Sequence, residues 1–191
     1  MQKVKKGEFG HLDYKKKLNL IIAIIAFAII LAIFIIGWIV NGTRNNIATV
    51  AAIVLVLPAA KFAVAYFVLL PHKSASKELA EKVNSAAEPL GVCFDLIFSN
   101  KKSPIGTQAV VVSDSTIVAL TCEEKADIKL FETSLVTFME TDKLHVTVTL
   151  YKDEKTFLKR VANLAANFDE TKENAMNKIE WNTNSLMNMC L

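Results

Sequence analysis

The chain has 191 residues, of which 52% are hydrophobic and 21% are charged, and its formal net charge is +3. Because its mean hydropathy is +0.34 although charged residues are nearly as frequent as in soluble proteins, the apolar residues must be concentrated in part of the chain. This composition excludes a disordered chain. Six glycines and four prolines are too few for a collagen-like or linker sequence, and three cysteines without metal-type spacing exclude a disulfide framework.

The apolar residues form two runs that are long enough to cross a membrane. Residues 18–40 contain Asn19 as their only polar side chain and cover roughly 34 Å as a helix, against a hydrocarbon core of about 30 Å. Residues 47–71 form the second predicted span, and Pro58 is expected to kink it. A cleaved signal peptide is the alternative for the first run, but no small-residue cleavage pattern follows it.

The short segment 41–46 between the runs predicts an antiparallel hairpin with both chain ends on one side of the membrane. Asn41-Gly42-Thr43 matches a glycosylation sequon, but we interpret it as part of the turn. The turn carries one basic residue, Arg44, whereas residues 1–17 form a basic arm whose lysines are Lys3, Lys5, Lys6, Lys15, Lys16 and Lys17. The positive-inside rule therefore predicts a multi-pass protein of the plasma membrane, with a bacterial membrane as the best fit and both termini cytoplasmic.

The positive charge belongs to the membrane-proximal arm and not to the rest of the chain. Residues 1–17 carry a net charge of +4, and residues 72–191 carry −3. We expect the six lysines of the arm to contact anionic lipid headgroups. A slightly acidic folded part lacks the basic surface that nucleic-acid binding requires, so we expect no nucleic-acid partner.

Residues 72–182 are long enough for one cytoplasmic α+β domain, and residues 183–191 read as an irregular tail. In chain order the patterns predict a helix over 76–88, a strand over 92–98, a loop over 99–106 and a β-hairpin over 107–122 with its turn at 113–115. The next element is a helix over 125–141, for which a strand is the alternative, and a strand over 144–151 follows it. The last element is a helix that Asp153 caps, that breaks near Asp169 and that ends near Trp181. The resulting order, α-β-β-β-α-β-α, predicts a mostly antiparallel sheet of about four strands covered by helices.

This element order resembles the core of the restriction-endonuclease-like nucleases. That resemblance implies a divalent metal held by Asp114 and Glu123, with Lys125 orienting the attacking water. Asp114 is predicted in the hairpin turn, however, and Glu123 beyond the far end of the next strand, so the carboxylates are expected roughly 25 Å apart. We therefore expect no catalytic, metal or cofactor site, and the metal-dependent enzyme remains an alternative.

The remaining candidates are interaction residues. His145 and Tyr151 lie on the polar side of a predicted strand, and Tyr151 and Trp181 are candidate aromatic anchors for a protein partner. Lys61 is unexpected within a span, because a lysine at the bilayer centre costs about 2.5 to 3.5 kcal/mol. Its side chain either extends to the cytoplasmic headgroups, faces a protein interface within the hairpin or a homo-oligomer, or serves a transporter or channel as part of an accessory subunit. The sequence as a whole favours a membrane-tethered adaptor, scaffold or regulatory domain without catalytic activity.

Overall fold

The computed structural model describes residues 4–43, 45–99, 103–169 and 174–191, and these form six helices and one four-stranded sheet. The chain divides into two compact units. We call residues 13–71 the hairpin, and residues 1–12 together with 72–191 the domain. The first residues of the chain thus belong to the same unit as its last residues, although the sequence places them at opposite sides of the two apolar runs.

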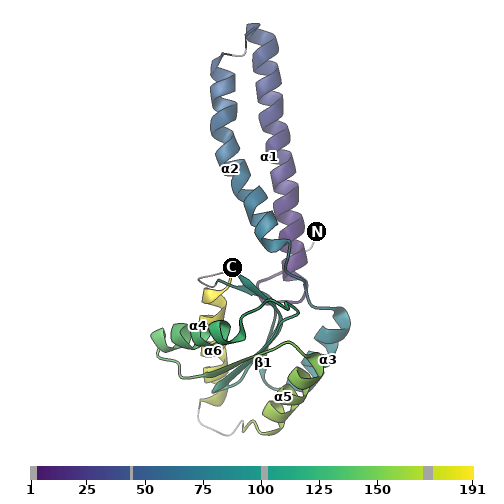
Figure 1. Cartoon of the computed structure of the whole chain (residues 1–191), viewed down its shortest axis with the longest axis vertical. Helices are drawn as coiled ribbons and strands as arrows, with labels where there is room; N and C mark the ends of the chain where they lie inside the picture. The colour runs from purple at the N-terminus through teal and green to yellow at the C-terminus, as the bar shows by residue number, and fades with distance from the viewer. Residues whose placement is uncertain (1–3, 44, 100–102, 170–173) are drawn as a thin grey trace. The chain divides into compact units, whose positions relative to one another are not determined.

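The hairpin consists of two antiparallel helices, α1 (His11–Asn41) and α2 (Ile47–Leu69), which lie side by side (Figure 1). Both helices occupy the predicted positions and are long and apolar enough to cross a membrane. α1 begins before the first apolar run, so that Lys15, Lys16 and Lys17 belong to this helix. Only 11% of the most apolar window of each helix is buried, which leaves most of their apolar side chains exposed.

The turn end of the hairpin is closely packed. A Cβ atom on Gly37 would lie 2.4 Å from the Cβ atom of Ala48, so a larger residue does not fit where the two helices meet. Asn46 caps α2 by accepting a hydrogen bond from the backbone N–H of Thr49 at 3.0 Å. The Nδ2 atom of Asn46 also donates to the carbonyl oxygens of Gly37 at 2.9 Å and Thr43 at 2.8 Å. One asparagine therefore connects the start of α2 with the end of α1.

The domain contains a mixed sheet with the spatial order β1-β2-β3-β4. Its strands are β1 (Gly91–Phe98), β2 (Ile105–Val112), β3 (Thr116–Leu120) and β4 (Thr147–Tyr151). The pairs β1–β2 and β2–β3 are antiparallel, as the predicted hairpin requires, whereas β3 and β4 are parallel. The sheet is therefore mixed, and the expectation of a mostly antiparallel sheet holds for two of its three strand pairs. A helix connects β3 with β4 and returns the chain to the same end of the sheet, which makes the pair parallel.

Side-chain caps fix the starts of three domain helices. Ser76 caps α3 (Lys77–Ala87) and Asp153 caps α5 (Glu154–Ala166), as predicted. α4 (Ile128–Thr141) is a helix, which excludes the strand alternative, and Asp127 caps it slightly later than expected. In each case the side-chain oxygen accepts a hydrogen bond from a backbone N–H of the first turn.

The C-terminal region differs from the sequence-based prediction. A further helix, α6 (Ala175–Met189), covers the expected end near Trp181 and most of the tail that was predicted to be irregular. The sequence pattern of this segment is weak, but Leu186 is fully buried and Ile179 is 6% exposed. Packing against the sheet therefore stabilises a helix that the local sequence does not predict. Part of the predicted break, residues 170–173, lies outside the described residues.

The domain is a three-layer structure in which α4 and α6 cover one face of the sheet and α3 and α5 cover the other (Figure 1). The first face has a core around Leu135, Met139 and Leu186, and the second around Val83, Phe157 and Val161. β2 and β3 lie in the centre of the sheet and are buried on both faces, as their uninterrupted apolar sequences predict.

Strand β1 does not keep the simple alternation that its sequence suggests. Phe94 packs on the face of α3 and α5, whereas Leu96 and Phe98 pack on the opposite face. The residue between them, Asp95, has a φ of 55°, and this left-handed conformation interrupts the alternation of side chains along the strand. Asp95 itself belongs to neither apolar core, and its side chain is the centre of the candidate site.

Candidate functional site

A buried aspartate joins the two segments of the domain that lead into the hairpin. Asp95 is 3% exposed. Its carboxylate accepts hydrogen bonds from the backbone N–H of Gly10 and of Ala75, each at 2.8 Å, and from the hydroxyl of Ser74. Gly10 directly precedes α1, and Ser74 and Ala75 follow Pro71, the last residue of the hairpin. One carboxylate therefore fastens both segments through which the chain passes between the two units.

The surroundings of Asp95 explain how a charge is accommodated in an apolar strand. A buried carboxylate is stable only where hydrogen-bond donors replace its water, and here two backbone amides and one hydroxyl do so. Aspartate also tolerates the left-handed backbone conformation better than most residues. The same side chain thus satisfies the backbone of β1 and the two segments that meet it.

A second set of contacts fixes the chain immediately after the hairpin. His72 is 5% exposed, and its Nδ1 atom lies 2.5 Å from Oε1 of Glu123. The imidazole and the carboxyl group therefore form a direct hydrogen-bonded pair. The same Oε1 atom accepts the backbone N–H of Gly106 at 2.8 Å, and the hydroxyl of Thr121 donates to the carbonyl oxygen of Gly106 at 2.7 Å. His72 is thereby held against the beginning of β2.

Residue 106 is a glycine at a position where a side chain has no space. A Cβ atom there would lie 2.7 Å from Oε1 of Glu123, 2.9 Å from Nδ1 of His72 and 3.0 Å from its Cβ atom. Any side chain at residue 106 would therefore separate the two partners. We call the set Gly10, His72, Ser74, Ala75, Asp95, Gly106 and Glu123 the anchor junction.

The N-terminal segment continues from the anchor junction along the outer edge of β1. The carbonyl oxygen of Gly7 accepts the backbone N–H of Phe94 at 2.8 Å, and the ring of Phe9 meets that of Phe94 edge to face at 6.4 Å between centroids. From the C-terminal end, Cys190 forms a β-bridge with Phe98, and the N–H of Leu191 donates to Ile97 at 2.8 Å. Both ends of the chain thus cover the edge strand and satisfy its free hydrogen-bonding groups.

Lys6 belongs to this covering and not to a free basic arm. Its Nζ atom donates to the carbonyl oxygen of Met187 at 2.8 Å and to that of Cys190, at the C-terminus of α6. A lysine suits this place, because the last carbonyl groups of a helix lack backbone partners and carry partial negative charge. Lys6 is therefore engaged within the domain, and its contact with lipid stays a prediction.

The other lysines of the predicted arm are placed differently from one another. Lys5 and Lys17 are exposed, whereas Lys15 and Lys16 are partly buried and make contacts within the chain. Lys3 lies outside the described residues. Lipid contact by Lys5 and Lys17 stays a prediction.

The residues of the nuclease-like pattern are not brought together. Asp114 lies in the turn between β2 and β3, where it accepts hydrogen bonds from the hydroxyls of Ser113 and Ser115. Glu123 lies beyond the other end of β3, a strand of five residues that spans about 16 Å, and Lys125 is exposed in the following loop. Among the residues that the structure describes, no group of three or more His, Cys, Asp or Glu side chains could hold a metal ion.

The three candidate interaction residues of the domain lie at different places in the fold. His145 is exposed but precedes β4, which is shorter than the predicted strand over 144–151. Tyr151 is partly buried, and its ring packs edge to face on Phe157 at 6.4 Å. Trp181 is 58% exposed on α6. Their role in binding a partner stays a prediction.

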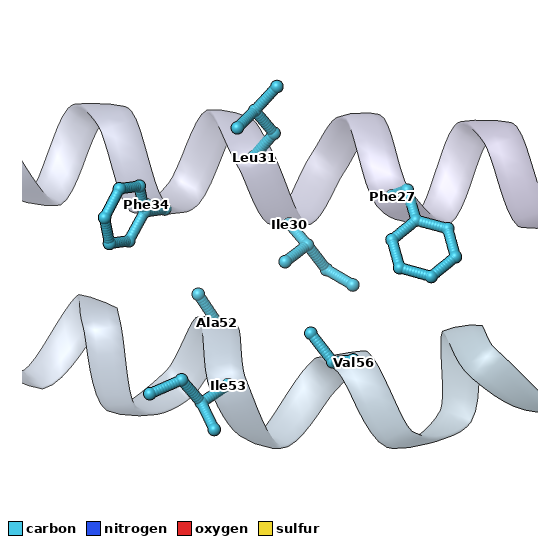
Figure 2. A pocket seen from close by; sticks show the side chains of 7 residues that line it. All are labelled: Phe27, Ile30, Leu31, Phe34, Ala52, Ile53 and Val56. Carbon is cyan, nitrogen blue, oxygen red and sulfur yellow. The ribbon is translucent and has the colours of Figure 1, made fainter.

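Lys61 lies on the outside of the hairpin. It is exposed, so the interpretation that it faces the interface between α1 and α2 is wrong. That interface contains apolar side chains instead. It includes a groove of about 390 Å³ whose lining is drawn in Figure 2: Phe27, Ile30, Leu31, Phe34, Ala52, Ile53 and Val56. With a wholly apolar lining, this groove offers no group for chemistry.

The cysteines differ in reactivity because they differ in burial. Cys93 and Cys190 are buried, and Cys122 is exposed. Burial raises the pKa of the Cys93 thiol to about 11 and that of the Cys190 thiol to about 12. Both stay protonated at neutral pH and do not act as nucleophiles.

The anchor junction escaped the sequence reasoning, although one signal for it was present. Asp95 is the only charged residue in the apolar segment 92–98, where simple alternation would place it on a buried face. A lone acid in a strand that is covered by helices must have partners. The partners themselves are backbone amides far away in the sequence, and no residue pattern identifies them.

The chain was also compared with known proteins. No family model matches it, and neither the curated proteins nor the solved structures contain a match.

Proposed function

We propose that this protein is an integral membrane adaptor whose hairpin crosses the bilayer twice and whose domain serves as a non-catalytic binding subunit at the cytoplasmic surface. The observation that carries the proposal is the double fastening of the domain at Asp95. A carboxylate that holds the segment before α1 and the segment after α2 leaves neither of them as a flexible linker.

The exposed surface of the hairpin supports membrane insertion. Side chains such as Ile39, Ile47 and Leu57 are 74%, 86% and 75% exposed, which is far more apolar surface than a water-soluble protein presents. A core helix of a soluble protein would be buried, whereas only 11% of each apolar window is buried here. Lipid is the environment that satisfies such a surface.

The charges next to the hairpin support the proposed orientation. Lys17 precedes the first apolar run, and Lys73 and Lys77 follow the second, whereas the turn between α1 and α2 carries Arg44 alone. The excess of lysine at the end that joins the domain favours a cytoplasmic domain with both chain termini on the same side.

The contacts of Asp95 include both chain segments next to the hairpin in the folded domain, which supports a domain that is built as part of a membrane protein. The separate positions of Asp114 and Glu123 give no comparable support to the metal-dependent enzyme.

The native thiol of Cys122 allows both location and orientation to be tested. Membranes that contain the protein are first washed with alkaline carbonate, which removes peripheral proteins and leaves inserted ones. A membrane-impermeant maleimide is then added to intact cells and to inside-out vesicles. We expect carbonate resistance, and labelling of Cys122 in inside-out vesicles only, because this thiol is exposed whereas Cys93 and Cys190 are buried.

The Cys122→Ser variant is the matched control, and its labelling should disappear. Labelling of Cys122 in intact cells would reverse the orientation, and release by carbonate would remove the membrane proposal altogether. The adaptor role is tested on the inserted protein by purification in mild detergent. We expect a stoichiometric protein partner that is lost when Asp95 is replaced by alanine, whereas a partner-free protein that turns over a substrate would contradict the adaptor.

A further inference from the structure

We propose that the outward face of α2 binds a membrane-spanning helix of another protein that carries an aspartate or glutamate opposite Lys61. This inference deepens the proposed function and rests on its first part, the insertion of the hairpin in a membrane. It names a partner by its chemistry, a carboxylate within an apolar helix.

α2 has two opposite faces with the same spacing. On the inward face, Ala52 and Val56 point towards α1 (Figure 2), and Ala59 is buried one turn further along the helix. The outward face repeats at alternating intervals of four and three residues, and it consists of Val50, Val54, Leu57, Lys61, Val64 and Val68. An inward residue and the outward residue two positions after it, such as Ala59 and Lys61, are about 200° apart around the helix axis, so the two sets lie on opposite faces.

The outward face has the pattern of a helix-packing surface, but no described residue covers it. Its five apolar residues are 39% to 75% exposed, and Lys61 is exposed at its centre. The four-three spacing is that of helices that pack along their length at a small angle, and the small valines allow a close approach.

The depth of Lys61 argues against contact with the headgroups. Lys61 precedes the end of α2 at Leu69 by about 12 Å and follows its start at Ile47 by about 21 Å along the helix axis. In a core of about 30 Å, its Cα atom lies about 10 Å from the nearer boundary. The four-carbon side chain of lysine reaches about 6 Å, which is too short.

The direction of the side chain makes headgroup contact harder still. In an α-helix the Cα–Cβ bonds lean towards the N-terminus. In α2 the N-terminus is the turn end at Ile47, which is the more distant boundary. The side chain of Lys61 thus leaves the helix in the direction away from the nearer boundary, and at this depth its ammonium group requires a partner.

The chain itself supplies no counter-charge at this depth. After Asp13, the next acidic residue in the sequence is Glu78, so the hairpin contains no carboxylate beyond its first residue. A second copy would bring another Lys61 to the same face, and two ammonium groups repel each other in a low dielectric. Charge complementarity thus selects a different protein with an acid in its span.

Pro58 provides a second polar group on the same face. A proline has no N–H to donate, so the carbonyl oxygen of Val54 lacks its usual hydrogen bond within the helix. Val54 and Lys61 are seven residues apart, or about two turns. A partner helix with a carboxylate near Lys61 and a hydroxyl side chain two turns away could satisfy both groups at once.

The test uses the full chain in vesicles of neutral phosphatidylcholine, in which anionic lipid cannot replace the partner. A donor fluorophore is attached to Cys122, and an acceptor is attached to a synthetic leucine–alanine membrane helix. The probe helix carries a single aspartate at its midpoint, and the control helices carry asparagine or leucine there. Energy transfer as a function of peptide-to-lipid ratio measures the association.

We expect the aspartate helix to bind the wild-type protein about tenfold more tightly than the leucine helix, and Lys61→Leu to abolish this difference. Lys61→Arg should keep it. The matched control exchanges two neighbours, Lys61→Phe with Phe62→Lys, which retains composition, charge and depth but moves the lysine about 100° around α2. This variant should behave like Lys61→Leu.

Three results would overturn the inference. The first is equal binding of the aspartate and leucine helices by the wild-type protein. The second is binding that persists after Lys61→Leu or after the exchange with Phe62. The third is association between copies of the chain that depends on Lys61. Carbonate resistance, measured on the same samples, separates these results from a failure of membrane insertion, which would instead refute the proposed function.

Discussion

Replacement of Asp95 by alanine should release both segments that the anchor junction holds. Without the carboxylate, the backbone N–H groups of Gly10 and Ala75 lose their acceptor, and burial prevents water from replacing it fully. Each unsatisfied buried donor costs about 1 to 3 kcal/mol. Alanine also tolerates the φ of 55° at this position poorly, at a cost of about 1 kcal/mol. We therefore expect a total loss of about 3 to 7 kcal/mol in the stability of the junction.

Two further substitutions separate these contributions. Asp95→Gly removes the acceptor but relieves the backbone, so it should be less harmful than alanine by about 1 kcal/mol. Asp95→Asn retains one oxygen for Ala75 and presents an amide to Gly10, which should cost about 1 to 2 kcal/mol. Glu140→Ala, at an exposed position of α4, is the control and should have no effect.

Hydrogen–deuterium exchange of the full chain in detergent measures the effect where it occurs. In Asp95→Ala we expect the amide of Ala75 and the segment around Gly10 to exchange at least about 100-fold faster, since each 1.4 kcal/mol of opening free energy corresponds to a factor of ten. The core strands β2 and β3 should keep most of their protection. Unchanged exchange in both segments, or equal effects of asparagine and alanine, would refute the reasoning.

Three other predictions concern packing and the buried thiols. Gly37→Val should separate α1 from α2 at the turn, because the added side chain meets Ala48. Cysteine crosslinking between the helix ends should then become less efficient. Unchanged crosslinking would show that the turn is less closely packed. Gly106→Ala should displace His72 from Glu123 and lower the free energy of unfolding, measured by urea titration, by about 1 to 3 kcal/mol. A change below about 0.5 kcal/mol would contradict the close packing. Because burial raises the pKa of the Cys93 and Cys190 thiols above that of an unfolded cysteine, near 8.5, the domain should be fully stable below that pH and lose stability as the pH rises towards 11. Replacement of both cysteines by alanine should remove this slope in melting temperatures, and an unaltered slope would assign it to other groups.

The candidate site shows where residue patterns cease to be informative. Lys61 stood out in the sequence because a charge within an apolar run is rare, and the structure then placed it outside the helix pair. Lys6 and Lys5 look alike in the sequence, yet Lys6 binds the C-terminus of α6 and Lys5 is exposed. The difference depends on an element more than 150 residues away, as the separation of 181 residues between Lys6 and Met187 illustrates.

The elements with a strong local signal were determined by the sequence alone. The two apolar runs, the caps at Ser76 and Asp153 and the turn between β2 and β3 follow from hydrophobicity, hydrogen-bonding side chains and turn residues within a few positions of one another. Such features depend on interactions between residues that are close in the sequence, so the sequence alone predicts them.

Only the tertiary structure decided the rest. The parallel pairing of β4, the helix α6 and the meeting of Gly10, Ala75 and Asp95 all depend on contacts between distant parts of the chain. Backbone amides, which every residue except proline possesses, make the decisive hydrogen bonds at Asp95, so their identity leaves no trace in the sequence. The physical reason is that a donor group common to all residues gains its role only from its position in space.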